Sequence, residues 1–185
     1  CKITSDYLES LSIDKMVPTA LYCQYMVTRG KLTKTTLAYV AGLFDGEGSV
    51  TIGATRKSNP NYKSAQHVLM VTCTNGHKPT IDWLHETFGA SKAMRKRFRN
   101  NPKWRACYTW SVTALKAYEF LKAITPYLKI KQEQALLGMK FQEEKAYRKF
   151  IHSGVARGHT LSPETVKVRD LMAQRMKKLN AKEWL

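Results

Sequence analysis

The fold expected of this chain is decided by one stretch of its sequence, Val40-Ala41-Gly42-Leu43-Phe44-Asp45-Gly46-Glu47-Gly48. The stretch completes a segment, 35–46, in which Leu37, Val40 and Phe44 recur at helical spacing, so it predicts an amphipathic helix that ends at Gly48. A second row of this helix consists of small residues four positions apart, namely Ala38, Gly42 and Gly46. Because glycine inside a helix costs about 1 kcal/mol relative to alanine, we expect close packing of this row to offset the loss.

A row of small residues lets two helices approach almost to backbone contact. The helix can pack in this way within its own domain or against a second copy of the chain, and we favour the second interpretation. The residues expected at the interface of such a homodimer are Ala38, Ala41, Gly42, Asp45 and Gly46.

Symmetric pairing would also bring together two Glu47 carboxylates, at helix ends that each carry about half a negative charge. That arrangement is unfavourable unless a cation lies between the two ends. We therefore expect Glu47 and Gly46 to be metal ligands. Mg²⁺ fits because it prefers oxygen ligands, keeps several waters and binds substrate phosphates.

The sequence after this stretch alternates between strand and helix patterns. Strands are predicted over 49–55, 67–74, 93–99 and 104–112, and helices over 78–88, 114–124 and 131–147. This order describes an α+β domain whose four strands form two hairpins. Ser162 and Pro163 then fit the N-cap and first position of a C-terminal helix. Its apolar stripe is expected to consist of Val168, Leu171, Met172, Met176 and Leu179.

The stretch from Val40 to Gly48 resembles the LAGLIDADG motif of a family of homing endonucleases at all nine positions, five of them identical. Residues 125–135, Thr-Pro-Tyr-Leu-Lys-Ile-Lys-Gln-Glu-Gln-Ala, are similar to the family's proline-led turn into its third core helix. The resemblance implies a LAGLIDADG core, α-β-β-α-β-β-α with a four-stranded antiparallel DNA-binding sheet, over residues 33–148. Residues 1–32 then form an N-terminal extension and residues 149–185 a C-terminal helical extension.

The resemblance also implies three catalytic residues. The last acid of the motif is a metal ligand in the family, and this role falls to Glu47, where most members have Asp. Lys131 stands where the family has a basic residue near the scissile phosphate, with a solvated lysine at a helix start as the alternative. Asn75 ends the second strand, where the family has a polar side chain that positions solvent, and a two-residue shift of that strand would move the role. The implied cofactor is Mg²⁺, with Mn²⁺ as a substitute and Ca²⁺ supporting binding without cleavage.

The charge of the chain favours a polyanionic partner. There are 31 Lys and Arg residues against 14 Asp and Glu, for a formal net charge of +17. The segment 92–105 contains seven Lys and Arg residues and no acidic residue, and alternate positions of a strand share one face of a sheet. A polar and basic sheet face suits the major groove of DNA, and a merely solvated face is the alternative. The residues expected to contact DNA are Ser49, Thr51, Thr55, Lys57, Arg95, Arg97, Arg99, Arg105, Cys107 and Thr109.

These features favour an intron- or intein-encoded type of enzyme, a homing endonuclease that hydrolyses double-stranded DNA as a homodimer on a long, near-palindromic site. Two alternatives stay open: a maturase that binds intron RNA on the same fold, and a DNA-binding protein that has lost catalysis. The four cysteines lack zinc-site spacing, and no apolar run reaches the length of a membrane span. The first residues lack a signal-peptide pattern. We therefore expect an intracellular protein without a membrane partner, in an organelle or a prokaryotic cytoplasm.

Overall fold

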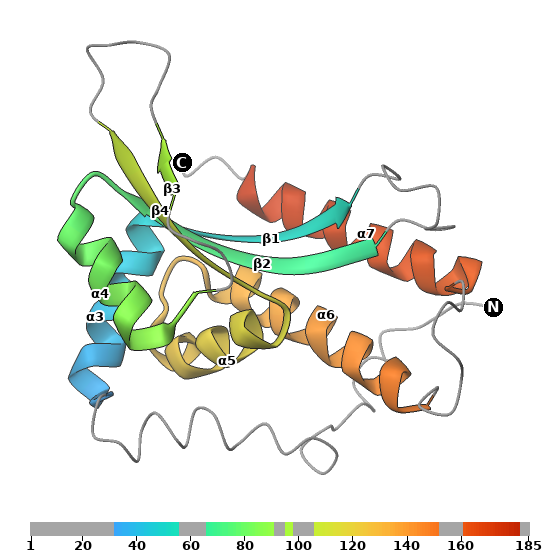
Figure 1. Cartoon of the computed structure of the whole chain (residues 1–185). Coiled ribbons are helices and arrows are strands. Elements are labelled where there is room, and N and C mark those ends of the chain that lie inside the picture. Colours follow the sequence, from blue (N-terminus) through green and yellow to red (C-terminus); the bar gives the residue numbers. More distant parts are fainter. Residues whose placement is uncertain (1–31, 56–65, 91–94, 98–105, 152–160, 182–185) are drawn as a thin grey trace.

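The computed structural model of the chain describes residues 32–55, 66–90, 95–97, 106–151 and 161–181. Its elements, labelled in Figure 1, follow one another as α3 (Lys34–Glu47), β1 (Gly48–Thr55), β2 (Gln66–Asn75), α4 (Lys78–Phe88), β3 (Arg95–Arg97), β4 (Cys107–Thr113), α5 (Ala114–Ile124), the short 3-10 helix η1 (Thr125–Tyr127), α6 (Gln132–Ile151) and α7 (Pro163–Asn180). The expected α+β order is confirmed. The segment 1–31 and three candidate DNA contacts, Lys57, Arg99 and Arg105, lie outside the described residues.

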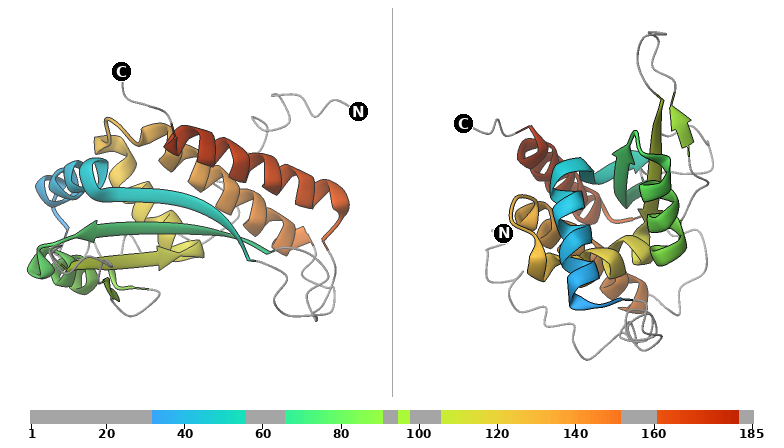
Figure 2. Two further views of the ribbon diagram at one scale, coloured as in Figure 1. Left: turned by 90° about the horizontal axis from the view of Figure 1, so that it is seen from above. Right: turned by 90° about the vertical axis from the view of Figure 1, so that its left-hand side faces the viewer.

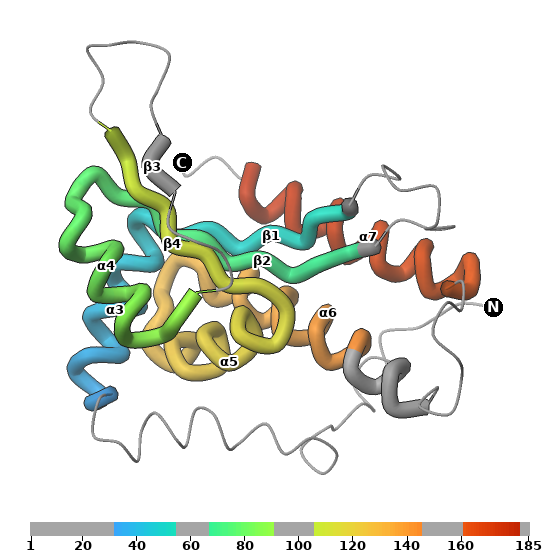
Figure 3. The backbone as a smooth tube through the Cα atoms, viewed as in Figure 1, coloured from blue at the N-terminus to red at the C-terminus, as the bar shows by residue number. Residues whose placement is uncertain are grey.

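The four strands form one antiparallel sheet in the order β1-β2-β4-β3. Side chains alternate between its two faces, and one face is buried. The buried residues of this face are Val50, Ile52, Leu69, Val71, Cys73, Trp110 and Val112. Ala54, which the sequence pattern groups with Val50 and Ile52, is instead exposed near the end of β1. Helices α5 and α6 lie against the buried face, and Figure 3 follows the chain from β4 through both of them.

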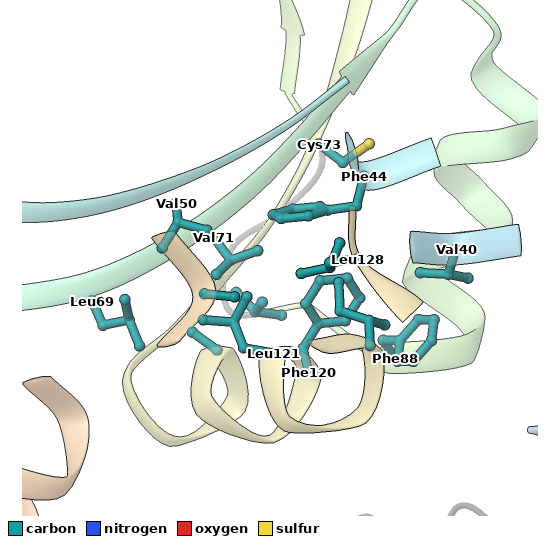
Figure 4. Packing of buried hydrophobic residues seen from close by; sticks show 14 of the residues in the cluster. Val40, Phe44, Val50, Leu69, Val71, Cys73, Phe88, Phe120, Leu121 and Leu128 are labelled. Atoms are coloured by element: carbon teal, nitrogen blue, oxygen red, sulfur yellow. The ribbon is translucent and has the colours of Figure 1, made fainter. Parts of the chain in front are cut away.

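The junction between α3 and β1 is fixed by the aromatic core. Phe44 is 1% exposed, and its ring meets that of Phe120 edge to face at a centroid distance of 5.4 Å (Figure 4). Phe120 also packs against Trp110, with the two ring centroids 4.9 Å apart. A Cβ atom on Gly48 would overlap the Phe44 ring, so only glycine allows β1 to begin directly after Glu47. The C-terminal end of α3 is therefore held firmly against the sheet.

Helix α7 lies along β1 and α6 (Figure 2) and extends the core with Met172 and Met176, which are both buried. Ser162 caps this helix as predicted, because its hydroxyl oxygen accepts the N–H of Thr165 at 3.3 Å. The expected apolar stripe is wrong at Leu171, which is 56% exposed because the buried face of the helix is centred on the two methionines. Within the described residues, no helix combines the length and the apolar character that crossing a membrane requires.

Candidate active site

The last turn of α3 carries two acidic residues in contrasting environments. Asp45 is 9% exposed, and its carboxylate accepts two backbone N–H groups, from Lys129 at 2.8 Å and from Lys131 at 2.9 Å. Glu47 is exposed. The last turn contains no basic residue, so both carboxylates add to the negative end of the helix. This end of α3 is therefore a position where a cation is stabilised.

Lys131 places one cation at this helix end. Its ammonium group donates to the backbone carbonyl of Asp45, and its own carbonyl accepts the N–H of Ala135 at the start of α6. Burial lowers the pKa of Lys131 below its usual value, and the nearby Asp45, Cys73 and Glu47 oppose that shift. The alternative of a solvated lysine does not describe this half-buried, hydrogen-bonded side chain.

The residue of β2 that joins this group is Cys73, which the sequence analysis did not select. Cys73 pairs with Gly48 across the sheet, immediately beside the end of α3. Its pKa is raised from 9.0 to about 12, first by burial and then by the negative charge of Glu47, while Lys131 acts in the opposite direction. The β-ladder register therefore places Cys73 beside Glu47 and Lys131. No sequence pattern reveals this, because the register depends on pairing between distant strands.

Asn75, the expected solvent-positioning residue, lies two positions further along β2. It extends past the first residue of β1 and pairs with Tyr108 of β4. Its side-chain oxygen accepts the N–H of His77 at 2.7 Å, which is a local turn bond at the entry to α4. The solvent-positioning role of Asn75 stays a prediction, as does the two-residue shift that would move it to Cys73. Asn75 serves the turn, and Cys73 lies closer to the acidic end of α3.

The row of small residues on α3 faces away from the chain's own core. Ala38, Gly42 and Gly46 are exposed, and among the residues that the structure describes a Cβ atom built on either glycine meets no other atom within 4 Å. Packing against the described part of the chain therefore does not account for these glycines. The expected interface must be corrected at Ala41 and Asp45, because both side chains are buried inside their own chain, at 0% and 9% exposure. They lie on the core side of the helix, next to Phe44.

The face of the sheet opposite the core is rich in hydroxyl groups. The register aligns Ser49, Thr72 and Ser111 across three strands, and Thr51 lies on the same face. These four side chains are all partly exposed. Helices α5 and α6 lie on the other side of the sheet, so they leave this surface open (Figure 1). The surface offers hydrogen-bond donors and acceptors over the width of β1, β2 and β4.

The candidates near β3 differ in accessibility. Cys107 is partly exposed, whereas Thr109 is 8% exposed and shares a 2.9 Å hydrogen bond with the hydroxyl of Thr74. The register places Arg97 opposite Cys107 and Arg95 opposite Thr109, at positions of the same sheet face. Thr55 ends β1 in register with Gln66. The polar surface therefore extends towards β3, although Thr109 presents little of its own side chain to a partner.

The residues at the end of α3 fit a hard divalent cation in their chemistry. Glu47 offers an exposed carboxylate, and Gly46 is exposed beside it, so its backbone carbonyl is a second oxygen donor. No group of three or more His, Cys, Asp or Glu residues that would enclose a metal occurs in the described part of the chain. Two oxygen donors from one chain suit Mg²⁺, which keeps several of its waters, better than they suit a closed structural site.

Comparisons by sequence give no match, since neither a protein-family model nor a curated protein sequence matches the chain. Solved structures do match. The homing endonuclease I-CvuI, in complex with a DNA target in the presence of Mg, superposes with a TM-score of 0.61 at 17% identity, over 82% of this chain and 86% of I-CvuI. The archaeal intron-encoded homing endonuclease I-Vdi141I, in complex with DNA, has a TM-score of 0.50 at 12% identity, over 80% and 98% of the two chains.

A third match is the LAGLIDADG homing endonuclease I-GzeII in complex with its DNA target, with a TM-score of 0.51 at 13% identity, over 80% of this chain and 44% of I-GzeII. These identities are low, so the likeness concerns the arrangement of helices and strands. It agrees with the motif at the end of α3 and with the four-stranded sheet. The chain therefore has the fold of the LAGLIDADG homing endonucleases.

Proposed function

We propose that this protein is a site-specific DNA endonuclease that cuts double-stranded DNA as a homodimer and requires a divalent metal ion. The observation that carries the proposal is the position of Glu47. Its exposed carboxylate stands at the negative end of α3, between the exposed row of small residues and the hydroxyl-rich face of the sheet. One chain thus offers a metal ligand, a surface for close helix contact and a surface for DNA at adjacent positions.

Two copies that meet along the exposed row would place their Glu47 residues side by side. Glu47 and the carbonyl of Gly46 would hold the metal, Mg²⁺ by preference. The bound ion would supply an activated water and stabilise the leaving oxygen of the phosphodiester. The ammonium of Lys131 would stabilise negative charge that develops on the scissile phosphate, since it already lies at this end of α3. The role of Cys73 would be to fill the space beneath these groups.

DNA would lie on the open face of the sheet. Ser49, Thr51 and Ser111 would contact bases or phosphates, and Arg95 and Arg97 stand at register positions of the same face. Arginine on a two-stranded ribbon can bind guanine through two hydrogen bonds in the major groove. The formal charge of +17 adds attraction that does not depend on sequence and that weakens with salt.

The proposal is tested with a plasmid library that carries random inserts, incubated with the full chain in Mg²⁺ and then sequenced at the cut ends. Glu47→Gln keeps the size of the side chain but removes its charge, so cleavage should fall by orders of magnitude while gel shifts in Ca²⁺ stay unchanged. Glu86→Gln is the matched control, because Glu86 is an exposed glutamate on α4. A wild-type chain that binds one DNA sequence without cutting it would support a DNA-binding protein instead. Specific binding to folded RNA alone would support a maturase.

A further inference from the structure

Asp45 connects two segments that are distant in sequence. Its carboxylate binds the N–H groups of Lys129 and Lys131, residues that follow it by 84 and 86 positions. The ammonium of Lys131 returns to the carbonyl of the same Asp45. Three hydrogen bonds therefore join Asp45 of α3 to the short segment 129–131. Two come from backbone N–H groups of that segment and one from the side chain of Lys131.

The location of this carboxylate is unfavourable for stability on two counts. It is almost fully buried, and it lies at the helix end that is already negative. Two charge-assisted bonds to backbone N–H groups offset this, since such bonds are stronger than neutral ones. An apolar residue at position 45 would remove the buried charge but would leave the N–H groups of Lys129 and Lys131 without this acceptor, so the aspartate serves the segment 129–131 as well as α3.

We propose that Asp45 is a positioning residue that holds Lys131 at the end of α3, at a fixed location relative to Glu47. The inference rests on the proposed function, in which Lys131 stabilises charge on the phosphate. Glu47 follows Asp45 by two residues, and the α3–β1 junction after it is fixed by the contact of Gly48 with Phe44. The side chain of Asp45 holds the backbone of Lys131, and the backbone carbonyl of Asp45 accepts a hydrogen bond from the Lys131 ammonium group. A single residue therefore sets the distance between Lys131 and Glu47.

The main test is a double-mutant cycle of Asp45→Asn and Lys131→Ala, measured as kcat on the cognate DNA. Asparagine has a single acceptor oxygen and places an NH₂ group against one of the two N–H donors. In the wild-type background kcat should fall on the order of 10²-fold, as for a reacting group misplaced by about 1 Å. In the Lys131→Ala background Asp45→Asn should cause no further loss, because the residue that it positions is absent. Additive losses in the cycle would overturn the proposal, since residues that act through one another are not additive.

Two further readouts separate positioning from a merely structural role. KM and the affinity for DNA in Ca²⁺ should stay at wild-type values in Asp45→Asn, and a loss of binding equal to the loss of kcat would overturn the proposal. Asp82→Asn, at an aspartate on α4 that pairs with Lys78, is the matched control and should leave kcat unchanged. If Asp45→Asn does not fold, Asp45→Glu keeps the charge, moves the oxygens by one methylene and enters the same cycle.

Amide hydrogen exchange tests the hydrogen bonds in the wild-type chain without any reaction. The N–H groups of Lys129 and Lys131 should exchange slowly, and the protection of at least one of them should be lost in Asp45→Asn. Rapid exchange of both in the wild type would overturn the proposal. A wild-type chain that cuts no DNA yet protects both amides would disprove the proposed function while supporting the hydrogen bonds from Asp45. The two failures are therefore distinguishable.

Discussion

Gly42 is the position at which the stability of the single chain and the assembly of two chains should respond in opposite directions. A Cβ atom on Gly42 would meet nothing within 4 Å in the described part of the chain, and the residue lies in the interior of α3. Gly42→Ala therefore adds a methyl group without a clash and should raise the free energy of unfolding of the monomer by about 1 kcal/mol. For a chain of this length that corresponds to an increase in Tm of about 2–4 °C.

At the proposed contact between two copies the same methyl group should be harmful. Overpacking by one added group costs roughly 1–3 kcal/mol, and a two-fold contact receives one from each copy. The total, roughly 2–6 kcal/mol, raises the dissociation constant of the dimer by at least about 20-fold, because 1.4 kcal/mol corresponds to a factor of ten. Cleavage at protein concentrations near that constant should fall in proportion, and Gly42→Leu should abolish both dimer and cleavage.

Sedimentation velocity over a dilution series measures the dissociation constant, and thermal melting at the lowest concentrations measures the monomer. Leu115→Ala is the control, since Leu115 is 51% exposed on α5, away from the small row. A more stable monomer with an unchanged dimer would show that this row is not the contact between copies. A less stable monomer would show that Gly42 packs within its own chain, against the open surroundings seen here.

Four further results are expected, at three other sites. Gly138→Ala in α6 should lower the free energy of unfolding by up to about 2 kcal/mol. The added Cβ would lie 3.0 Å from Leu69, and the cost of this overpacking exceeds the gain in helix propensity of about 1 kcal/mol. Urea denaturation measures the change, and a stabilised variant would contradict the prediction. Arg169→Met removes the 3.0 Å ion pair with the buried Glu144 and should lower the free energy of unfolding by roughly 1.5–3 kcal/mol, the range for a hydrogen bond to a charged group. A change below about 1 kcal/mol in the same assay would show that the pair contributes little. Cys73 should resist alkylation at about pH 8 in the folded chain, because its pKa of about 12 suppresses the thiolate, and mass spectrometry that finds it fully labelled would contradict the burial. The folded chain also keeps the Cys73 proton that the unfolded chain releases above its pKa of 9.0, so its contribution to stability declines as pH rises from about 9 towards 12, and Cys73→Ala should flatten that decline in urea denaturation.

The order and the bounds of the core elements could be predicted because they depend on local periodicity. The helix expected over 35–46 spans Lys34–Glu47, and the helix Lys78–Phe88 ends where expected, before Gly89. The width of a buried helix face is not a local property. Ala41 and Asp45 are both buried, and Asp45 is covered by the segment that carries Lys131, which its carboxylate binds. Of the five residues expected at the contact between two copies, the three that form the row of small residues, Ala38, Gly42 and Gly46, are exposed.

The site was predictable where the motif names its residues and not where it depends on contacts between distant segments. Glu47 and Lys131 do lie at one end of α3, together with Asp45. Cys73 joins them because of the register in which β1 pairs with β2. From the sequence alone, either Cys73 or Asn75 could occupy this place. Neither strand carries a residue that fixes its register by itself. The pairing of β1 with β2, which places Gly48 opposite Cys73, decides which side chain of β2 approaches the acidic end of the helix.

Under the proposed function, the two acids of α3 would also let a strongly basic chain bind DNA while keeping the scissile phosphate away from Glu47 until a metal ion is bound. The net charge of +17 attracts phosphates over the whole surface, whereas the end of α3 is locally negative and repels them. The Asp45 carboxylate is buried and accepts N–H groups of the segment 129–131, so of the two acids of α3 it is Glu47 that is exposed to solvent. Under the proposed function, a scissile phosphate approaches Glu47 closely only when a cation lies between them, and the requirement for metal then follows from electrostatics as well as from the chemistry of hydrolysis.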